Sequence, residues 1–275
     1  MASLKSQRGG KTSEFDRLLF IMPGMAEAAK YRTAATGTGR RPWRRWLKWI
    51  ALGLAGLALL YHLVILFQVI RYRSANPGET ALMSQRRGEA DSAGRPARRE
   101  QTWVNYDQIS KNLVRAVLAG EDSRFFDHSG FDWEEIRKAA EKDWEEKRFH
   151  RGASTISQQL AKNLFLSTSK NPVRKLHEAL ITSEMELLLS KRRILELYLN
   201  VIEWGDGIYG AEAASRHYFN TSAASLTAEQ AAFLSAIIPN PRGAYNPNKH
   251  RRRVERRRNL IQRLMRHVVI PKDLY

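Results

Sequence analysis

A pair of carboxylates, Glu121 and Asp122, opens the stretch EDSRFFDHSGFDW, in which aromatic residues, a histidine and a glycine follow closely. A glutamate that is covered by rings such as Phe125 loses hydration, and this loss raises a carboxyl pKa toward neutral pH. Such a group can accept or donate a proton in acid–base catalysis. The simpler interpretation is a solvated charge pair at a helix end, with His128 as a structural histidine. The residue types alone leave both interpretations open.

A second polar cluster lies in GASTISQQLAKN, residues 152–163. Hydroxyl groups at a helix N-terminus, together with a lysine, suit a phosphate or a sugar, because N–H groups and positive charge both face the ligand. Gln159 and Lys162 are three residues apart and therefore share a helix face. Ordinary capping with an exposed polar face explains the same pattern without a ligand. The polar residues concerned are Ser154, Thr155, Gln158, Gln159, Lys162 and Asn163.

The stretch RKLHE places Arg174 and Glu178 four residues apart, so that both side chains face the same way on a helix. The pair suits a phosphate and a second reacting group, although an ordinary surface ion pair has the same spacing. A glutamate with a raised pKa, a cationic group and a second glutamate together fit the two-carboxylate logic of glycosyl chemistry. Composition and spacing do not decide whether water or a sugar hydroxyl is the acceptor.

Helices are predicted to position all three clusters. The spacing of Ile109, Leu113 and Val117 predicts a helix that ends at or just after Gly120 and delivers Glu121 to its terminus. Further helix starts are predicted at Thr155 with Gln158, Asn171 with Pro172, Ser190, and Thr227 with Gln230. Only TWVNY at 102–106 favours a strand. The pattern therefore predicts an all-α domain of roughly 170 residues, a usual size for one domain.

An apolar run at residues 49–70, interrupted only by His62 and Gln68, precedes this domain. It is long enough to cross a hydrocarbon layer of about 30 Å as a helix, and no cleavage site follows it. It is therefore interpreted as an uncleaved signal anchor, although a buried helix of a soluble protein has similar composition. The basic stretch RRPWRRWLK directly before the run favours a cytoplasmic N-terminus and places the remainder outside.

The chain is expected to have four parts. Residues 1–40 are polar and basic and predict a cytoplasmic, largely disordered tail. Residues 41–73 form the anchor and its basic flank, and residues 74–100, with their prolines and glycines, predict a linker or neck. The folded domain covers 101–275.

The composition limits the possible chemistry and partners. The formal net charge of +18 favours nucleic acid, anionic lipid or phosphorylated ligands, without choosing among them. The absence of cysteine excludes disulfides, cysteine nucleophiles and thiolate zinc sites. The basic run at 249–258 predicts a helix that packs on the domain and faces anionic headgroups.

Five motifs, in order, resemble the peptidoglycan glycosyltransferases, and in particular the monofunctional biosynthetic type that lacks a transpeptidase domain. They are EDSRFFDHSGFDW, RGASTISQQLAKNLFL, RKLHEALITSEMELLLSKRRILELYLN, EWGDGIYGAEAASRHYF and LTAEQAAFLSAIIPNPRGAYNP. The resemblance implies a lysozyme-like, all-α domain at the outer face of a bacterial inner membrane, in the periplasm. It further implies an inverting transfer that polymerises lipid II into glycan strands and releases undecaprenyl diphosphate.

The resemblance also implies roles for individual residues. Glu121 matches the general base on the acceptor hydroxyl, and Glu178 matches a second glutamate on the donor side. The residues expected to bind substrate are Lys162 and Arg174 at the diphosphate, with Gln159, Ser154, Thr155 and Asn163. The residues expected to shape the pocket of Glu121 are Asp122, Phe125 and His128.

The resemblance implies no required cofactor, and it leaves open a divalent cation, Mg²⁺ or Mn²⁺, at the diphosphate. The expected partners are lipid II, the growing strand, membrane lipids, and cell-division or cell-wall synthesis proteins, with no nucleic acid. Two alternatives remain beside this interpretation. A lysozyme-like hydrolase would use the same catalytic glutamate, and a membrane-tethered nucleic-acid-binding protein would use the RRRVERRR run.

Overall fold

The computed structural model describes residues 42–146, 154–169 and 171–274. The predicted tail at residues 1–40 lies outside these residues. The chain divides into two compact units, Met1–Leu59 and Leu60–Tyr275.

Helix α3 covers Pro42–Arg71, and its segment Arg45–Arg71 is long and apolar enough to cross a membrane. It is the one such helix within the described part of the chain. Its large apolar side chains, among them Trp46 and Leu54, are exposed, as contact with lipid requires. The prediction of a single apolar helix before the domain is confirmed.

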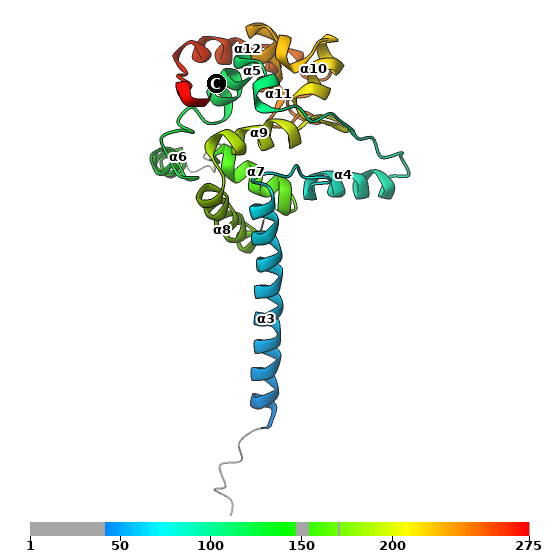
Figure 1. The fold of residues 1–275 in the computed structure, drawn as a ribbon, viewed down its shortest axis with the longest axis vertical. Helices are drawn as coiled ribbons and strands as arrows, with labels where there is room; N and C mark the ends of the chain where they lie inside the picture. Colours follow the sequence, from blue (N-terminus) through cyan, green and yellow to red (C-terminus); the bar gives the residue numbers. More distant parts are fainter. Residues whose placement is uncertain (1–41, 147–153, 170, 275) are drawn as a thin grey trace, which may run out of the picture. The chain divides into compact units, whose positions relative to one another are not determined.

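The unit Leu60–Tyr275 is built mainly of helices (Figure 1). They are α4 (Ala81–Ser92), α5 (Lys111–Glu121), α6 (Trp133–Glu146), α7 (Ile156–Phe165), α8 (Pro172–Leu188), α9 (Lys191–Val201), α10 (Ala211–Phe219), α11 (Ala228–Ile237) and α12 (Arg251–Leu264). Single 3-10 turns lie at η1 (Tyr106–Gln108), η2 (Ala223–Ser225), η3 (Met265–His267) and η4 (Lys272–Leu274). The predicted helical fold class is confirmed.

The predicted helix starts lie where the capping residues indicated. Thr155 begins α7 through a reciprocal capping box with Gln158, and Thr227 begins α11 in the same way. Asn171 accepts the N–H of Val173 ahead of α8, whose first residue is proline. These caps satisfy backbone N–H groups that have no partner inside the helix, so short local sequences suffice to locate them.

A three-stranded sheet was not predicted. Its strands are β1 (Glu100–Gln101), β2 (Glu203–Gly205) and β3 (Ile208–Tyr209), in the order β1-β3-β2. Strand β3 pairs parallel with β1 and antiparallel with β2. Strands of two or three residues are too short to show an alternating pattern, which explains why the sequence did not reveal them.

The strand expected at TWVNY, residues 102–106, is wrong. The sheet ends at Gln101, and Tyr106 begins a 3-10 turn. The side chain of Asn200 takes the place of a strand partner, because it accepts the N–H of Val104 and donates to its carbonyl, both at 2.9 Å. A side chain from α9 therefore satisfies this backbone, which propensity alone cannot reveal.

The segment 74–100, expected as a linker, contains helix α4. Thr80 caps this helix by accepting the N–H of Met83, and both Leu82 and Met83 are buried. Helix α4 also packs against α7. The segment is therefore part of the compact unit, because two apolar side chains near its start find a place in the core.

Helix packing places the two helices that carry the polar motifs. Helix α5 packs on α11 and α12, and α7 packs on α8 and α9. Leu113, Leu160 and Ile194 are fully buried members of the hydrophobic core. The C-terminal end of α5 and the polar face of α7 are thus held by buried contacts on several sides.

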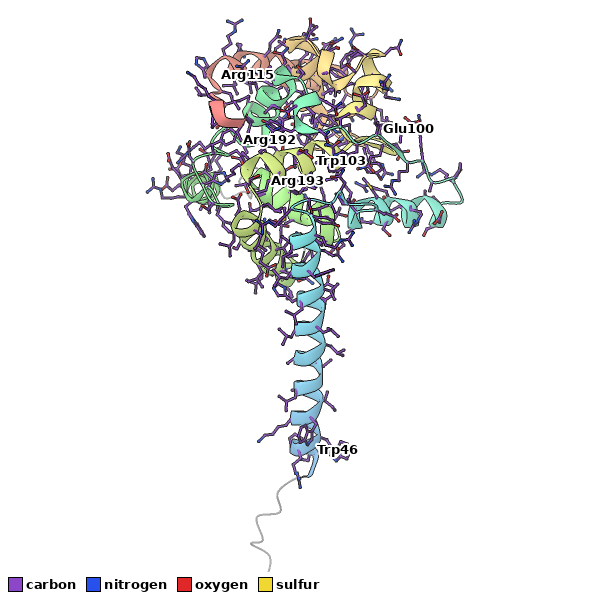
Figure 2. All side chains as sticks on the ribbon, in the orientation of Figure 1. Trp46, Glu100, Trp103, Arg115, Arg192 and Arg193 are labelled. Atoms are coloured by element: carbon purple, nitrogen blue, oxygen red, sulfur yellow. The ribbon has the colours of Figure 1, made fainter. Side chains whose placement is uncertain are left out.

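The end of α3 that belongs to this unit packs on the domain. Ile65 and Val69 are buried, and His62 Nε2 lies 2.6 Å from Glu184 Oε1 of α8. Arg193 of α9 donates to the carbonyl of Tyr72 at 2.7 Å, and its guanidinium lies over the ring of Trp103 (Figure 2). Polar and apolar contacts together hold the end of the helix against α8 and α9.

Candidate active site

Glu121 is the last residue of α5 and receives hydrogen bonds from two other helices. Its Oε2 accepts Nε2 of Gln159 at 3.0 Å, and its Oε1 accepts Nη2 of Arg257 at 2.8 Å. The hydroxyl of Tyr198 donates to Oε1 of Gln159 at 2.9 Å, which orients the amide so that its N–H₂ faces the carboxylate. The side chain of Glu121 is only 8% exposed.

Burial raises the pKa of Glu121 above its ordinary value of 4.5. The positive charge of Arg257 and the hydrogen bond from Gln159 oppose this rise. A carboxylate of raised pKa is a stronger base, provided that enough of it stays ionised at the working pH. The arrangement suits proton transfer better than a solvated charge pair would.

The three residues expected to shape the pocket hold the backbone around Glu121. Asp122 is buried and accepts two hydrogen bonds, from His128 Nε2 at 3.0 Å and from the N–H of Ile156 at 2.9 Å. Phe125 is fully buried and meets the ring of His128 edge-on, with 6.3 Å between centroids. Asp122 therefore connects the end of α5 to the start of α7.

Lys162 lies one turn beyond Gln159 on α7 and faces the same cleft as Glu121. Desolvation lowers its pKa, while the charge of Glu178 raises it and those of Arg174 and Lys175 lower it further. The cleft measures about 560 Å³. Its lining includes Glu121, Ser154, Gln159, Lys162, Tyr245 and Arg257.

Glu178 is buried on α8 between two cations. Arg174 Nη1 lies 2.6 Å from its Oε2, and Lys175 Nζ contacts its Oε1. Arg174 and Glu178 share a face as predicted, and they form an ion pair in which the exposed fraction of the Arg174 side chain is 17%. Neither residue lines the cleft of Glu121; Lys162 connects the two groups, because it interacts electrostatically with both glutamates.

The remaining predicted residues, Ser154, Thr155 and Asn163, lie at different places around the cleft. Ser154 is exposed at the cleft, whereas the hydroxyl of Thr155 is used by the cap of α7 and by a 2.6 Å hydrogen bond to the carbonyl of Gly130. Asn163 is buried and lines an adjoining pocket of about 290 Å³ together with Lys162 and Arg86. Thr155 thus acts first as a structural residue.

Two residues of the site were not predicted, Arg257 and Tyr198. Val254 and Ile261 are the buried residues of α12, and Arg257 lies between them in the sequence. The sequence could not distinguish Arg257 from its neighbours, because the run contains several arginines and nothing local shows which of them faces the site. Tyr198 lies in an apolar part of α9, where the sequence favours a core residue. It is fully buried, and its hydroxyl reaches the site by a hydrogen bond to Gln159.

The model of the transglycosylase family matches residues 89–266, which is more than half of the chain. The chain belongs to the transglycosylase family. This family membership makes it a glycosyltransferase, so the buried glutamate, the lysine and the second glutamate lie in the domain that carries the family's activity. The match also includes the last residues of α4 and the whole of α12, so α12 belongs to the family domain.

The chain aligns with nearly the whole length of several named relatives. The biosynthetic peptidoglycan transglycosylase of Dechloromonas aromatica is 51% identical over 227 residues, or 82% of this chain and 98% of the relative. The protein of the same name in Chromobacterium violaceum is 49% identical over 81% and 97% of the two chains. The one in Laribacter hongkongensis is 48% identical over 82% and 100%.

The residues around Glu178 in this transglycosylase do not fit a divalent cation. Both carboxylate oxygens already contact positive groups, Arg174 and Lys175, and a metal ion beside them would be repelled. Among the residues that the structure describes, no group of three or more His, Cys, Asp or Glu side chains is placed to hold a metal. We therefore assign no reaction step to a metal ion.

Replacing Arg257 by glutamine should raise the pKa of Glu121 further, because the principal charge that opposes the desolvation is lost. A base must be ionised to act, so the acidic limb of the kcat/KM profile should move to higher pH. The pH dependence of glycosyl transfer by the purified transglycosylase measures this shift. Arg258→Gln is the matched control, because Arg258 pairs with Glu229 instead. An acidic limb that stays in place in Arg257→Gln would contradict the assigned role of this guanidinium.

Proposed function

We propose that this transglycosylase polymerises lipid II into the glycan strands of peptidoglycan, with inversion and release of undecaprenyl diphosphate. One observation carries the proposal. Glu121, buried and with a raised pKa, lines the same cleft as the desolvated Lys162, and Lys162 also interacts electrostatically with the buried Glu178. The names of the relatives supply the polymer, peptidoglycan.

Glu121 acts as the general base in this proposal. It takes the proton from the acceptor sugar hydroxyl while that oxygen attacks the anomeric carbon of the donor. Gln159 and Arg257 hold the carboxylate in one orientation, so little rearrangement is needed before proton transfer. Arg257 also keeps a larger share of Glu121 ionised than burial alone would allow.

The departing diphosphate is stabilised by the cationic groups beyond Glu121. Lys162 and Arg174 provide positive charge where negative charge grows as the glycosidic bond breaks. Glu178 holds Arg174 in place by a 2.6 Å ion pair and also supports the charged form of Lys162. On this view Glu178 positions and tunes the cations on the donor side of the site.

The surface of α8 supports a substrate that stays in the membrane. Leu176, Leu180 and Leu187 are exposed on this helix, which also carries Glu178. His177 of α8 lies beside Tyr61 of α3, with 5.5 Å between ring centroids, and Tyr61 belongs to the membrane-spanning segment. One face of α8 therefore reaches the depth of the lipid surface while the other binds the cations of the site.

The proposal includes the location of the protein. The basic flank before α3 favours a cytoplasmic N-terminus, which places the unit Leu60–Tyr275 in the periplasm, at the outer face of the inner membrane. A lipid-linked substrate and an anchored enzyme then meet on one membrane surface. Proteins of cell division or cell-wall synthesis remain predicted partners of this location.

A polymerisation assay with the purified full-length protein and lipid II tests the function. Formation of glycan polymer together with free undecaprenyl diphosphate supports the proposal. Solubilisation of finished cell wall, without consumption of lipid II, would instead identify a hydrolase. Salt-sensitive DNA binding with neither reaction would favour the nucleic-acid-binding alternative.

A further inference from the structure

Helix α12 carries positive charge that the proposed reaction does not use. Arginine occupies residues 251–253, 256–258 and 263 of this helix, and Glu255 is its one acidic residue. Several of these arginines have carboxylate partners: Arg251 pairs with Glu255, Arg257 with Glu121 and Arg258 with Glu229. Within the part of the chain that the structure describes, Arg253 and Arg256 pair with no carboxylate. Their charges are therefore available to an anionic ligand.

These arginines line a groove that continues into the site. Arg253, Arg256, Arg257, Tyr245 and Leu260 enclose about 370 Å³. The guanidinium carbon of Arg253 lies 5.9 Å from the centroid of the Tyr245 ring, and that of Arg257 lies 5.6 Å from it. Tyr245 and Arg257 also line the cleft of Glu121, so the groove and the cleft share a wall. A ligand in the groove lies next to the base.

A lipid surface does not fit the position of this groove. His62 of α3 contacts Glu184 of α8. Glu178 of α8 interacts electrostatically with Lys162, and Lys162 does so with Glu121, which Arg257 contacts. Helices α8 and α12 lie on opposite sides of the unit Leu60–Tyr275 (Figure 1). The groove is thus on the far side of the site from the lipid-facing helix, which argues against the expectation that the basic run faces anionic headgroups.

The proposed function already assigns the diphosphate of the substrate to Lys162 and Arg174, on the side of α8, so the groove is left for another anionic group. The remaining anionic groups of a peptidoglycan precursor are the carboxylates of its peptide branches. Arginine binds carboxylates through paired N–H groups, and an aromatic ring beside it keeps the guanidinium in place.

We propose that Arg253 and Arg256, beside Tyr245, bind the carboxylates of the peptide branch carried by the glycan next to Glu121. The inference rests on the proposed function, because it takes a peptide-bearing glycan as the substrate of the site. The groove orients the sugar whose hydroxyl faces the base, and it favours substrates with acidic branches over neutral ones.

The test compares two forms of lipid II, one with free branch carboxylates and one with these carboxylates amidated. The wild-type protein should use the acidic form with a kcat/KM about tenfold higher, since two exposed ion pairs are lost on amidation. The double substitution Arg253→Gln with Arg256→Gln should remove this preference by lowering kcat/KM for the acidic form alone. Arg263→Gln is the matched control, because Arg263 is exposed on the same helix and lines neither groove nor cleft.

A second measurement does not need turnover. Soluble, peptide-bearing glycan oligomers, acidic or amidated, are titrated onto the wild-type protein and the double variant in detergent. The acidic oligomer should bind the wild type about tenfold more tightly than it binds the double variant. Failure of the wild type to polymerise lipid II, with this difference in binding intact, would count against the proposed function alone.

Several results would overturn the inference. One is an equal loss of kcat/KM on both forms of lipid II in the double variant, and another is a double variant that behaves as the wild type does. A third is loss of binding to vesicles that contain anionic lipid, with an unchanged preference between the two forms. That last result would assign the groove to lipid headgroups.

Discussion

Glu121→Gln is expected to reduce glycan polymerisation by about 10²- to 10⁴-fold, the usual contribution of a general base. The amide keeps the size of the carboxylate, but it has one acceptor oxygen and can keep only one of the hydrogen bonds that Gln159 and Arg257 donate. It also cannot accept the proton. Turnover of lipid II by the purified variant measures the loss. Glu229→Gln serves as the matched control, because Glu229 is exposed and also pairs with an arginine of α12. Substantial residual turnover would remove Glu121 from its role as base.

The same substitution should raise Tm at neutral pH. Burial raises the pKa of Glu121 in the folded protein above its ordinary value of 4.5, so the ionised form costs folding free energy. Stability from this group is complete below the unfolded pKa and falls as pH rises through the folded pKa. Glutamine is neutral throughout, so the gain in Tm should be present at pH 8 and absent near pH 4. An equal Tm difference at both pH values would contradict the raised pKa.

Glu178→Gln is expected to reduce turnover by about 10²-fold, the typical effect of disturbing one electrostatic group of a site. Arg174 and Lys175 lose their counter-charge, and Lys162 loses the carboxylate that supports its ammonium form. Because Arg174 is partly exposed and Lys175 about half exposed, the loss of their partner should also cost about 2 kcal/mol of unfolding free energy, less than for a fully buried pair. Turnover and urea unfolding of the variant measure the two effects.

The pH profile distinguishes a role in tuning the cations from a merely structural role of Glu178. Desolvation already lowers the pKa of Lys162, and the loss of Glu178 lowers it further. Because the ammonium form is the useful one, the alkaline limb of the rate profile should move to lower pH in Glu178→Gln. Glu141→Gln, on the exposed surface of α6, is the control that should leave the profile unchanged. An alkaline limb that does not move would mean that Glu178 does not act through Lys162.

The sequence was sufficient wherever the physics is local. A cap such as that of Thr155 with Gln158 involves residues three apart, and the pair Arg174 and Glu178 is four apart on one helix. The terminus of α5 at Glu121 followed from the spacing of apolar residues. The apolar length of α3 is likewise a property of contiguous residues.

Local rules were insufficient where short segments depend on distant partners. Strands β2 and β3 are too short to have a period of their own; they pair with each other, and β3 pairs in addition with the distant β1. Helix α4 arose in a segment rich in glycine and polar residues because Leu82 and Met83 are buried by the rest of the unit. The composition of this segment predicted a linker, because most of its residues are polar, and it gave no sign that Leu82 and Met83 are buried.

The sequence by itself determined the helices that begin at clear caps, the apolar span and the residue types that could transfer a glycosyl group. Only the tertiary structure decided which residues share a site, because Glu121, Gln159 and Arg257 come from three helices that meet through packing. It also decided the chemistry of Glu121, since desolvation depends on everything packed around the carboxylate and not on its neighbours in the chain. The same packing turned one arginine of a basic run toward the base and left two others facing an open groove.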